Sequence, residues 1–289
     1  MTYLAHKLVG MMAQTAVHAG ASSNENLIDL PIQRESHSDW PVVVGSGVKG
    51  AWRAKAEVEV KQQPEVLTAI FGPDTNNASD HAGAIMVSDA RLLLLPVRSL
   101  TSHFKWLTCP ALLTRFARDK QRLGFGGNIH TFSTDEQTAL VFTEQAEDLH
   151  LEEYRFKTQK TENDLLVNEL LSVMGDSYKD ELIKNLTIIS DDQFRYFCRA
   201  AIPVQAHIAI ESETKTVKPG ALWYEETLPA ETLMYNCLTF SDDRSQGKMS
   251  AADLAECFSN ELIVTSPYLQ VCGNATVGMG WFALTVAQK

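Results

Sequence analysis

The sequence lacks a long apolar run: its longest aliphatic block, Leu92 to Leu95, is far shorter than the roughly 20 residues that a membrane-spanning helix requires. The N-terminus includes His6 and Lys7 and lacks the apolar stretch and small-residue cleavage site of a signal peptide. These absences argue against a helical membrane protein and against a secreted one. We therefore expect a soluble, cytoplasmic protein with no membrane partner.

Cysteine is scarce, and the sequence has neither of the two patterns that give cysteine a structural role. The five cysteines are odd in number and none belongs to a CxxC pair, which argues against a disulfide framework and a zinc ribbon. The sequence also lacks a P-loop and paired histidine metal ligands. We expect all five cysteines to be reduced residues of the core.

A net positive charge is also missing. The formal charge of -11 argues against a nucleic-acid partner, because lysine and arginine make the contacts to phosphate. The charge is unevenly distributed, however. Residues 91–122 hold seven basic side chains and one acid, a balance of +6, whereas residues 135–192 hold fifteen acids and five bases, a balance of -10. A basic surface could face an anion, although solvated helix faces explain the pattern equally well.

The N-terminal part of the chain predicts a strand, a long loop and a helix. Apolar residues alternate over 9–17 and predict a strand that ends at His18, and the polar stretch 19–39 predicts a surface loop. A helix over 48–59 is predicted, with Ser46 as its N-cap. Lys49 and Arg53 then share one face near exposed backbone N–H groups, an arrangement suited to phosphate.

The remaining pattern alternates strands and helices and predicts an α+β fold. Helices are expected over 110–123, over 163–174, over 191–198 with Ser190 as N-cap, and over 251–260. The segment 207–224 predicts a protruding hairpin, and the expected tip residues are Lys215, Lys218, Pro219 and Gly220.

Several short motifs together resemble the RAMP-superfamily backbone subunits of type III-B CRISPR ribonucleoprotein complexes. They lie in order along nearly the whole chain: 18–20 (HAG), 28–35 (IDLPIQRE), 41–53 (PVVVGSGVKGAWR), 70–73 (IFGP), 88–91 (SDAR), 96–100 (PVRSL), 108–110 (TCP), 223–226 (WYEE) and 273–280 (GNATVGMG). The chain has GSGVKG over 45–50 where the family usually shows GSSLKG, and Cys272 where the last loop often begins with glycine. A single glycine motif would be weak, but the ordered set is specific.

The resemblance implies one elaborated domain over 1–289 with a ferredoxin-like, RRM-like core. The core would comprise 1–60, 84–100 and 230–289, with a helical insertion over about 101–200 and a thumb hairpin over about 201–228. Copies of such a subunit stack helically along a guide RNA, together with other subunits of the complex, and cut the paired single-stranded target RNA at regular intervals.

The resemblance places the catalytic aspartate of the family at Asp29. A carboxylate with an ordinary pKa of about 3.9 is a weak base, so a divalent metal ion, Mg or Mn, held in part by Asp29 is expected to assist it. An Asx turn before Pro31 is the alternative role for Asp29. His18, Glu225 and Glu226 are secondary candidates. The alternative for His18 is a structural role at the end of the strand, and the alternative for the two glutamates is that of solvated strand ends.

The same resemblance nominates residues that bind RNA. Backbone N–H groups and side chains at the start of the predicted helix would hold guide phosphates, and the last glycine-rich loop would form a second cradle. Trp223 or Tyr224 could stack on a displaced base, and core packing is the alternative for either. The predicted RNA-binding set is Ser46, Gly47, Lys49, Arg53, Asn274, Thr276, Gly278, Gly280, Trp223, Lys215 and Lys218.

Three functions remain open from the sequence. The chain could be an active endoribonuclease subunit that cuts at Asp29, or a catalytically silent architectural subunit that only binds RNA. It could also be a small-molecule enzyme of ferredoxin-like fold, in which residues 273–280 hold a nucleotide phosphate. No matching catalytic cluster supports the third possibility.

Overall fold

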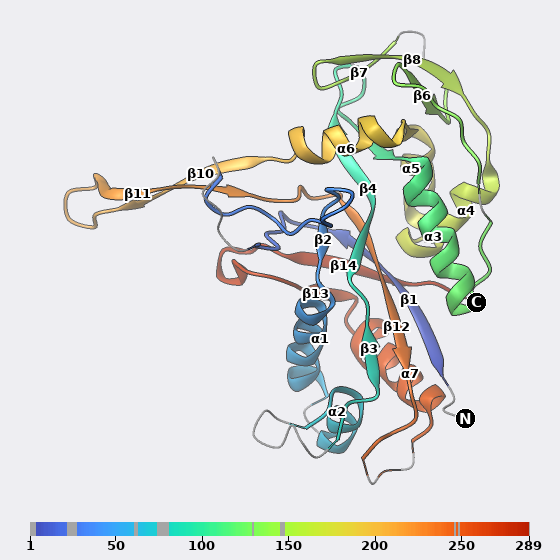
Figure 1. The fold of residues 1–289 in the computed structure, drawn as a ribbon. Coiled ribbons are helices and arrows are strands. Elements are labelled where there is room, and N and C mark those ends of the chain that lie inside the picture. The colour runs from blue at the N-terminus through green and yellow to red at the C-terminus, as the bar shows by residue number, and fades with distance from the viewer. Residues whose placement is uncertain are drawn as a thin grey trace.

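A computed structural model describes residues 4–21, 28–60, 63–73, 81–128, 130–144, 148–245, 247 and 249–288. Figure 1 shows a large sheet with helices packed around it and a hairpin that projects well away from the rest of the chain. The predicted mixture of strands and helices is confirmed. Among the described residues, no helix is long and apolar enough to cross a membrane.

The large sheet has twelve strands. They are β1 (Ala5–Ala13), β2 (Val42–Val43), β3 (Ile85–Val87), β4 (Ala90–Arg98), β5 (Phe104–Thr108), β6 (Thr138–Val141), β7 (Leu149–Leu151), β8 (Tyr154–Lys160), β9 (Leu186–Ile188), β12 (Leu233–Phe240), β13 (Tyr268–Gln270) and β14 (Trp281–Val286). Their order is β13-β14-β1-β12-β4-β5-β9-β6-β8-β7, with β2 on β4 and β3 on β12. Pairing is antiparallel except for β5 with β9 and β6 with β8.

Seven α-helices pack around this sheet in the described part of the chain. They are α1 (Gly45–Glu59), α2 (Pro64–Phe71), α3 (Pro110–Leu123), α4 (Asp164–Met174), α5 (Lys179–Asn185), α6 (Asp191–Ala200) and α7 (Ala251–Ser259). Three short helical turns are η2 (Asp176–Tyr178), η3 (Asn260–Val264) and η4 (Ala275–Val277). Residues 101–200, predicted as a helical insertion, thus also contribute five strands to the same sheet.

The central strand β1 is buried on both faces rather than on one. Val9 and Met11 pack into one apolar cluster with α1, α2 and α7, whereas Leu8 and Met12 pack into another with α3 and α4. The alternation that predicted a half-buried strand therefore comes from two cores on opposite faces of the sheet.

Most predicted helix limits agree with the structure, and one predicted cap is wrong. The helix over 110–123 has the predicted limits, and the side chain of Ser190 caps α6 by accepting a hydrogen bond from the Gln193 N–H. Helix α1 begins at Gly45 instead of residue 48, and its N-cap is Val44. Ser46 lies inside the first turn, because the Asp89 carboxylate already accepts a hydrogen bond from the Gly45 N–H at 2.7 Å.

The projecting hairpin consists of β10 (Val204–Ile210) and β11 (Val217–Glu226), which form a separate two-stranded sheet. Lys215 lies in the predicted tip, whereas Lys218 belongs to β11, so the tip is shorter than predicted. Cross-strand pairing places an exposed apolar row on one face of the hairpin. Its members are Val204, Ile208, Leu222 and Tyr224.

The contact between β1 and α4 gives a stability prediction at Gly10. A Cβ atom at this position would lie 1.7 Å from the backbone oxygen of Val173, so Gly10→Ala should lower the free energy of unfolding by about 1–3 kcal/mol. At Gly50 in α1, no neighbouring atom lies within 4 Å of the place that a Cβ atom would take, so Gly50→Ala should instead raise this free energy by about 0.5–1 kcal/mol. Urea denaturation of both variants measures the difference, and equal stability would contradict the packing.

Candidate active site

Three chain segments that are distant in the sequence meet where the hairpin joins the sheet. Leu30 pairs with Glu225 of β11: the Leu30 N–H donates to the Tyr224 carbonyl at 3.0 Å, and the Glu226 N–H donates to the Leu30 carbonyl at 3.0 Å. The segment that follows His18 joins at Gln33, whose N–H donates to the Ala19 carbonyl at 2.7 Å. This root of the hairpin brings together the segments of all four predicted catalytic candidates.

Asp29 is exposed and oriented by a single backbone group. Its Oδ2 accepts a hydrogen bond from the Tyr224 N–H at 2.7 Å, across a sequence separation of 195 residues. The alternative Asx turn needs the N–H of residue 31, and Pro31 has none. Within the described ranges, Oδ1 has no hydrogen-bond partner. Asp29 therefore presents one free carboxylate oxygen to solvent from a fixed position.

Glu225 is buried at this root, with only 4% of its surface exposed. Its Oε1 accepts a hydrogen bond from the Asn274 amide and lies 3.4 Å from His18 Nδ1. Its Oε2 lies 3.7 Å from His207 Nε2. A buried carboxylate needs such partners, because burying a charge without them is costly. The alternative role of a solvated strand end is therefore wrong for Glu225.

Glu226 is also buried, and all of its polar groups bind within the protein. One carboxylate oxygen accepts the Ile32 N–H at 3.0 Å, and the other pairs with the Arg34 guanidinium.

His18 is bound to the backbone of the same residue. The Glu226 carbonyl accepts a hydrogen bond from His18 Nδ1 at 2.8 Å, so this ring nitrogen carries the proton. A Cβ atom at Gly20 would lie 2.8 Å from His18 Nε2, and the ring is only 12% exposed. Both side chains therefore hold segments together.

The glycine-rich loop approaches the same root through Asn274. The Asn274 amide donates to Glu225, and its backbone has a left-handed φ of 61°. Thr276 and Gly278 are exposed on the following turn. Gly280 is required by close packing, since its φ is 83° and a Cβ atom would lie 2.1 Å from the Val271 carbonyl oxygen. The Asn274 side chain, predicted to bind RNA, links the loop to Glu225 in this structure.

The start of α1 retains only part of the predicted phosphate site. The N–H groups of Gly47 and Val48 already donate to the Val44 carbonyl, at 2.9 and 3.2 Å. Arg53 is bound to Glu57 at 3.0 Å and to the carbonyls of Gly72 and Pro73. The backbone cradle and Arg53 are thus engaged within the protein.

Lys49 and Ser46 remain accessible at the start of α1. Within the described ranges Lys49 forms no hydrogen bond or ion pair, and partial burial together with the nearby Arg53 charge lowers its pKa. An anion placed beside Lys49 would offset both effects. The Ser46 side chain is exposed one turn earlier on the same helix.

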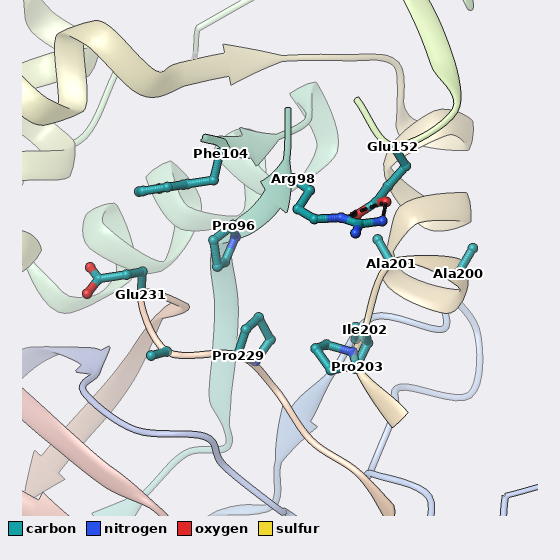
Figure 2. A pocket seen from close by; sticks show the side chains of 11 residues that line it. Pro96, Arg98, Phe104, Glu152, Ala200, Ala201, Ile202, Pro203, Pro229 and Glu231 are labelled. Carbon is teal, nitrogen blue, oxygen red and sulfur yellow. Dashed lines mark hydrogen bonds and ion pairs between the residues drawn. The ribbon is translucent and has the colours of Figure 1, made fainter. Parts of the chain in front are cut away.

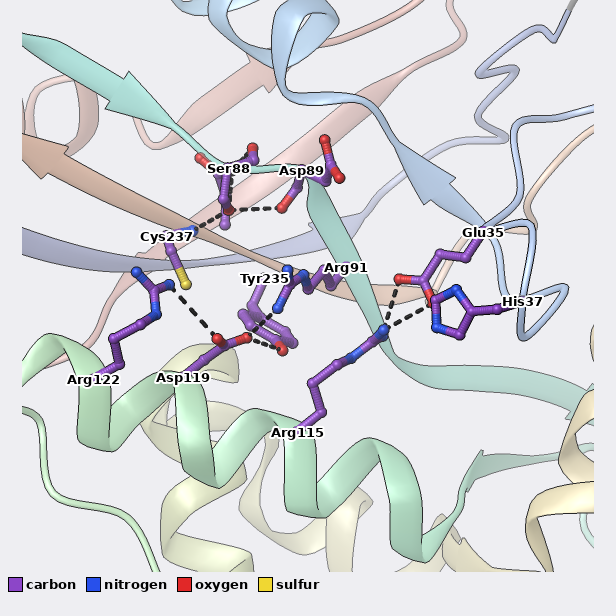
Figure 3. Close-up of polar contacts among 11 residues, drawn as sticks. Glu35, His37, Ser88, Asp89, Arg91, Arg115, Asp119, Arg122, Tyr235 and Cys237 are labelled. Atoms are coloured by element: carbon purple, nitrogen blue, oxygen red, sulfur yellow. Dashed lines mark hydrogen bonds and ion pairs between the residues drawn. The ribbon is translucent and has the colours of Figure 1, made fainter.

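The basic stretch 91–122 is mostly neutralised inside the protein, as Figure 3 shows for part of it. Arg91 and Arg122 face the Asp119 carboxylate at 2.7 and 3.6 Å, and Tyr235 donates to the same carboxylate at 2.8 Å. Arg115 donates to both oxygens of Glu35 (Figure 3), and Lys105 and Lys120 are buried. Only Arg118, in this stretch of described residues, is exposed without an acidic partner. The charge balance of +6 therefore overstates the basic surface.

The hairpin carries the remaining predicted residues. The Trp223 ring stacks on His207 with centroids 5.4 Å apart and planes 14° apart, whereas Tyr224 is exposed on the opposite face. Lys215 and Lys218 are exposed far from the root. Tyr224 is thus the more accessible of the two aromatic candidates, and it directly precedes Glu225 beside Asp29.

A pocket lies near the root of the hairpin but contains none of the predicted residues. It has a volume of about 540 Å³ and is walled mainly by proline and alanine side chains, as Figure 2 shows. Its charged residues Arg98 and Glu152 pair with each other, and burial raises the pKa of Glu231 at its edge. No reactive group in this pocket competes with the root of the hairpin as a candidate active site.

The described residues do not form a metal site from protein ligands alone. No three carboxylate, imidazole or thiol groups meet with suitable geometry in the described part of the chain. One carboxylate together with phosphate oxygens of a substrate is, however, a common ligand set for Mg²⁺. The free oxygen of Asp29 fits such an ion, held jointly with a bound phosphate.

Cysteine chemistry does not contribute to this site. All five cysteines are free, as predicted, but only three are buried in the core, because Cys257 and Cys272 are partly exposed. Burial raises the pKa of the thiols of Cys109, Cys198 and Cys237. Arg34 and His207 contribute to the site and were missed among the predicted functional residues. Arg34 lies within the 28–35 motif, which could have revealed it, whereas His207 becomes visible only through its pairing with Trp223.

Comparisons with known proteins agree on one family. A model of the RAMP superfamily matches residues 11–283. A relative from Pyrococcus furiosus, the "CRISPR system Cmr endoribonuclease Cmr4", is 33% identical, and the match covers 97% of this chain and 95% of the relative. The structure of oligomeric Cmr4 from the same organism has a TM-score of 0.74 at 27% identity, with 100% and 99% coverage. A chain in the type III-B Cmr-beta complex bound to cognate target RNA shares the fold, with a TM-score of 0.76 at 20% identity and coverage of 97% and 96%.

The contact of Asn274 with Glu225 gives a prediction for stability. Asn274→Gly keeps the left-handed backbone but removes the donor to a buried carboxylate, so the free energy of unfolding should fall by about 1–3 kcal/mol. Thr276→Ala, on the exposed turn of the same loop, should change it by less than about 0.5 kcal/mol. Chemical denaturation measures the free energy of unfolding of both variants. If Asn274→Gly leaves it unchanged, the contact adds no stability.

Proposed function

This chain belongs to the RAMP superfamily, and we propose that it is the repeated backbone subunit of a type III-B CRISPR complex that binds guide RNA and cleaves the paired target RNA at regular intervals. The identity of 33% to a protein named as an endoribonuclease, over almost the full length of both chains, supports this proposal. The expected partners are guide RNA, single-stranded target RNA, further copies of this chain in a helical stack and the other subunits of the complex.

The observation that carries the proposal is the position of Asp29. It is exposed at the root of the hairpin, one of its oxygens is fixed by the Tyr224 N–H, and the other is open to solvent. A general base requires this combination of fixed orientation and access to the substrate. The other nearby acids, Glu225 and Glu226, are buried and bound to protein groups, so Asp29 is the carboxylate available to RNA.

The proposed reaction is internal attack within the target strand. Asp29 accepts the proton of a 2′-hydroxyl, the 2′ oxygen forms a bond to the adjacent phosphorus, and the bond from phosphorus to the 5′ oxygen breaks. The products are a 2′,3′-cyclic phosphate and a 5′-hydroxyl, whose proton comes from solvent. Glu225, Glu226 and His18 do not exchange protons in this scheme, because they hold the segments that position Asp29.

A divalent ion, Mg or Mn, is part of the proposal. Asp29 would hold it together with oxygens of the scissile phosphate, and the ion would supply charge stabilisation for the phosphorane-like transition state. The protein's own contribution is to fix the carboxylate and to place the phosphate beside it.

The guide RNA is proposed to contact the start of α1 and the glycine-rich loop. Lys49 provides a charge that has no acidic partner among the described residues, and the Ser46 hydroxyl provides a hydrogen bond. Exposed backbone at Thr276 and Gly278 lets a phosphate approach closely. Sequence recognition would be left to base pairing between guide and target, because these contacts address only the RNA backbone.

We further propose that the sheet around β1, β12 and β4 is the ferredoxin-like core and that the β10–β11 hairpin is its thumb. The exposed apolar row on the hairpin needs a partner, because contiguous apolar surface of this kind marks interaction sites. A neighbouring copy or an unstacked base of the RNA would cover this row within the assembled complex.

Replacing Asp29 tests the catalytic assignment. Asp29→Asn keeps an oxygen that can accept the Tyr224 N–H but removes the charge, so cleavage by the reconstituted complex should fall by about 100-fold or more, with target affinity unchanged. Cleavage of a labelled, guide-complementary RNA with Mg²⁺ and with chelator measures the effect. Chelator should also abolish cutting by the wild-type complex.

The alternative outcomes of this experiment are informative. Asp29→Asn that cuts like wild type would make Asp29 a structural loop residue. A wild-type complex that binds target but does not cut would identify an architectural subunit. Cutting that survives chelator would remove the metal ion from the proposal while leaving Asp29 in place.

Lys49 tests the guide-binding surface. Lys49→Ala should weaken guide RNA binding and reduce the slope of log affinity against log salt by about 0.7, the value for one single-strand phosphate contact. Lys157→Ala, which removes an exposed lysine from β8 at the other end of the sheet, is the matched control and should leave both values unchanged. Filter binding at several salt concentrations gives the slopes, and equal slopes for the two variants would rule out a phosphate contact at Lys49.

A further inference from the structure

We infer that Arg34 is a positioning residue for RNA cleavage, because it fixes the direction of the hairpin relative to Asp29. This inference rests on the proposed function and adds to it a residue that determines where the target strand is cut. Arg34 lies five residues after Asp29, on the segment that pairs with β11, and its side chain is 20% exposed.

The Arg34 guanidinium binds the end of β11 and the helix α6 that precedes β10. Nη2 pairs with the Glu226 carboxylate at the end of β11. Nη1 donates at 2.6 Å to the carbonyl of Cys198, in the last turn of α6, which leads directly into β10. The same nitrogen donates at 3.0 Å to the Asp39 carbonyl, which anchors the loop. One side chain thus joins α6, β11 and the segment that carries Asp29.

The direction of the hairpin depends on contacts of this kind. Its strands β10 and β11 pair only with each other beyond the root, in the described part of the chain, and its apolar row is exposed. A two-stranded hairpin without a third strand or a packed face is marginally stable, so its orientation must be set where it joins the body. Figure 1 shows α6 running into β10 and β11 returning toward β12 at this junction.

The Glu226 carboxylate makes the arrangement sensitive to loss of Arg34. Glu226 is 3% exposed, and its second oxygen accepts the Ile32 N–H at 3.0 Å. Without Arg34, a buried charge would remain with only this neutral partner, an unfavourable state that is relieved when the carboxylate moves toward solvent. Such a movement would shift Ile32 and the segment that carries Asp29. The catalytic carboxylate would then lose its fixed position, although it is not itself altered.

A misplaced base has a recognisable effect on cleavage. A displacement of about 1 Å can reduce the rate of an oriented reaction by about 100-fold. A hairpin of variable direction would in addition let neighbouring phosphodiester bonds of the target reach the carboxylate. Loss of folded protein, in contrast, lowers the amount of product without moving the cut. The position of the cut therefore distinguishes a positioning role from a general structural one.

The test compares Arg34→Met with Arg195→Met in the full guide-loaded complex. Arg195 is a matched control, because it pairs with the Asp39 carboxylate but not with Glu226. Single-turnover cleavage of end-labelled target should fall by about tenfold or more in Arg34→Met, with products spread over neighbouring bonds and target affinity within about twofold of wild type. Arg195→Met should cut like wild type.

A double variant checks the proposed cause. Arg34→Met combined with Glu226→Gln removes the buried charge along with its partner, so it should recover part of the rate and of the cut precision relative to Arg34→Met alone. A double variant no better than Arg34→Met would overturn the role assigned to Glu226. Wild-type rate and cut position in Arg34→Met would overturn the inference as a whole.

A direct measurement of hairpin orientation separates this inference from the proposed function. Bioorthogonal spin labels at Thr214, in the hairpin tip, and at Lys157, on β8, report the distance between hairpin and sheet. The distance distribution should broaden in Arg34→Met and stay narrow in Arg195→Met. If the wild-type complex does not cut but this broadening is seen, the proposed function fails while the orienting role of Arg34 stands. An unchanged distribution would overturn that role.

Discussion

The buried carboxylate of Glu226 is the constraint on which the candidate active site depends. It is almost fully removed from water, so it must be paired, and its partners are the Arg34 guanidinium and the Ile32 N–H. Both partners belong to the segment that carries Asp29. The requirement to satisfy one buried charge therefore holds the loop that carries Asp29 against the root of the hairpin. The neighbouring Glu225 extends the same principle to the glycine-rich loop through Asn274.

This arrangement separates residues that position from residues that react. Glu225 and Glu226 are buried, His18 is partly buried, and each makes hydrogen bonds within the protein. Asp29, which is exposed, uses one oxygen for orientation and keeps the other free. A site of this form acts only when something else brings the phosphate to it. In the proposed complex, guide pairing and the stacked copies would bring the phosphate there.

The charges of the chain lead to a similar conclusion about RNA binding. A net charge of -11 and a basic stretch of +6 give opposite expectations when counted along the sequence. The structure shows that most of the basic side chains in that stretch bind acids or are buried, so neither count describes the surface. In that stretch only Arg118 is exposed without an acidic partner among the described residues, and the proposed phosphate contact at Lys49 lies outside it. Binding by few contacts per subunit suits a protein whose copies act together along one RNA.

The sequence by itself determined the family and most helix limits, and it nominated Asp29, because these depend on local pattern: spacing of apolar residues, capping side chains and short ordered motifs. It did not determine that β1 is buried on both faces, that residues 101–200 contribute five strands, or that Val44 rather than Ser46 caps α1. Only the tertiary structure decided which polar residues are buried. The partners of Glu225 and Glu226 come from segments up to about 200 residues away, and hydrogen bonding between such segments has no local signature in the sequence.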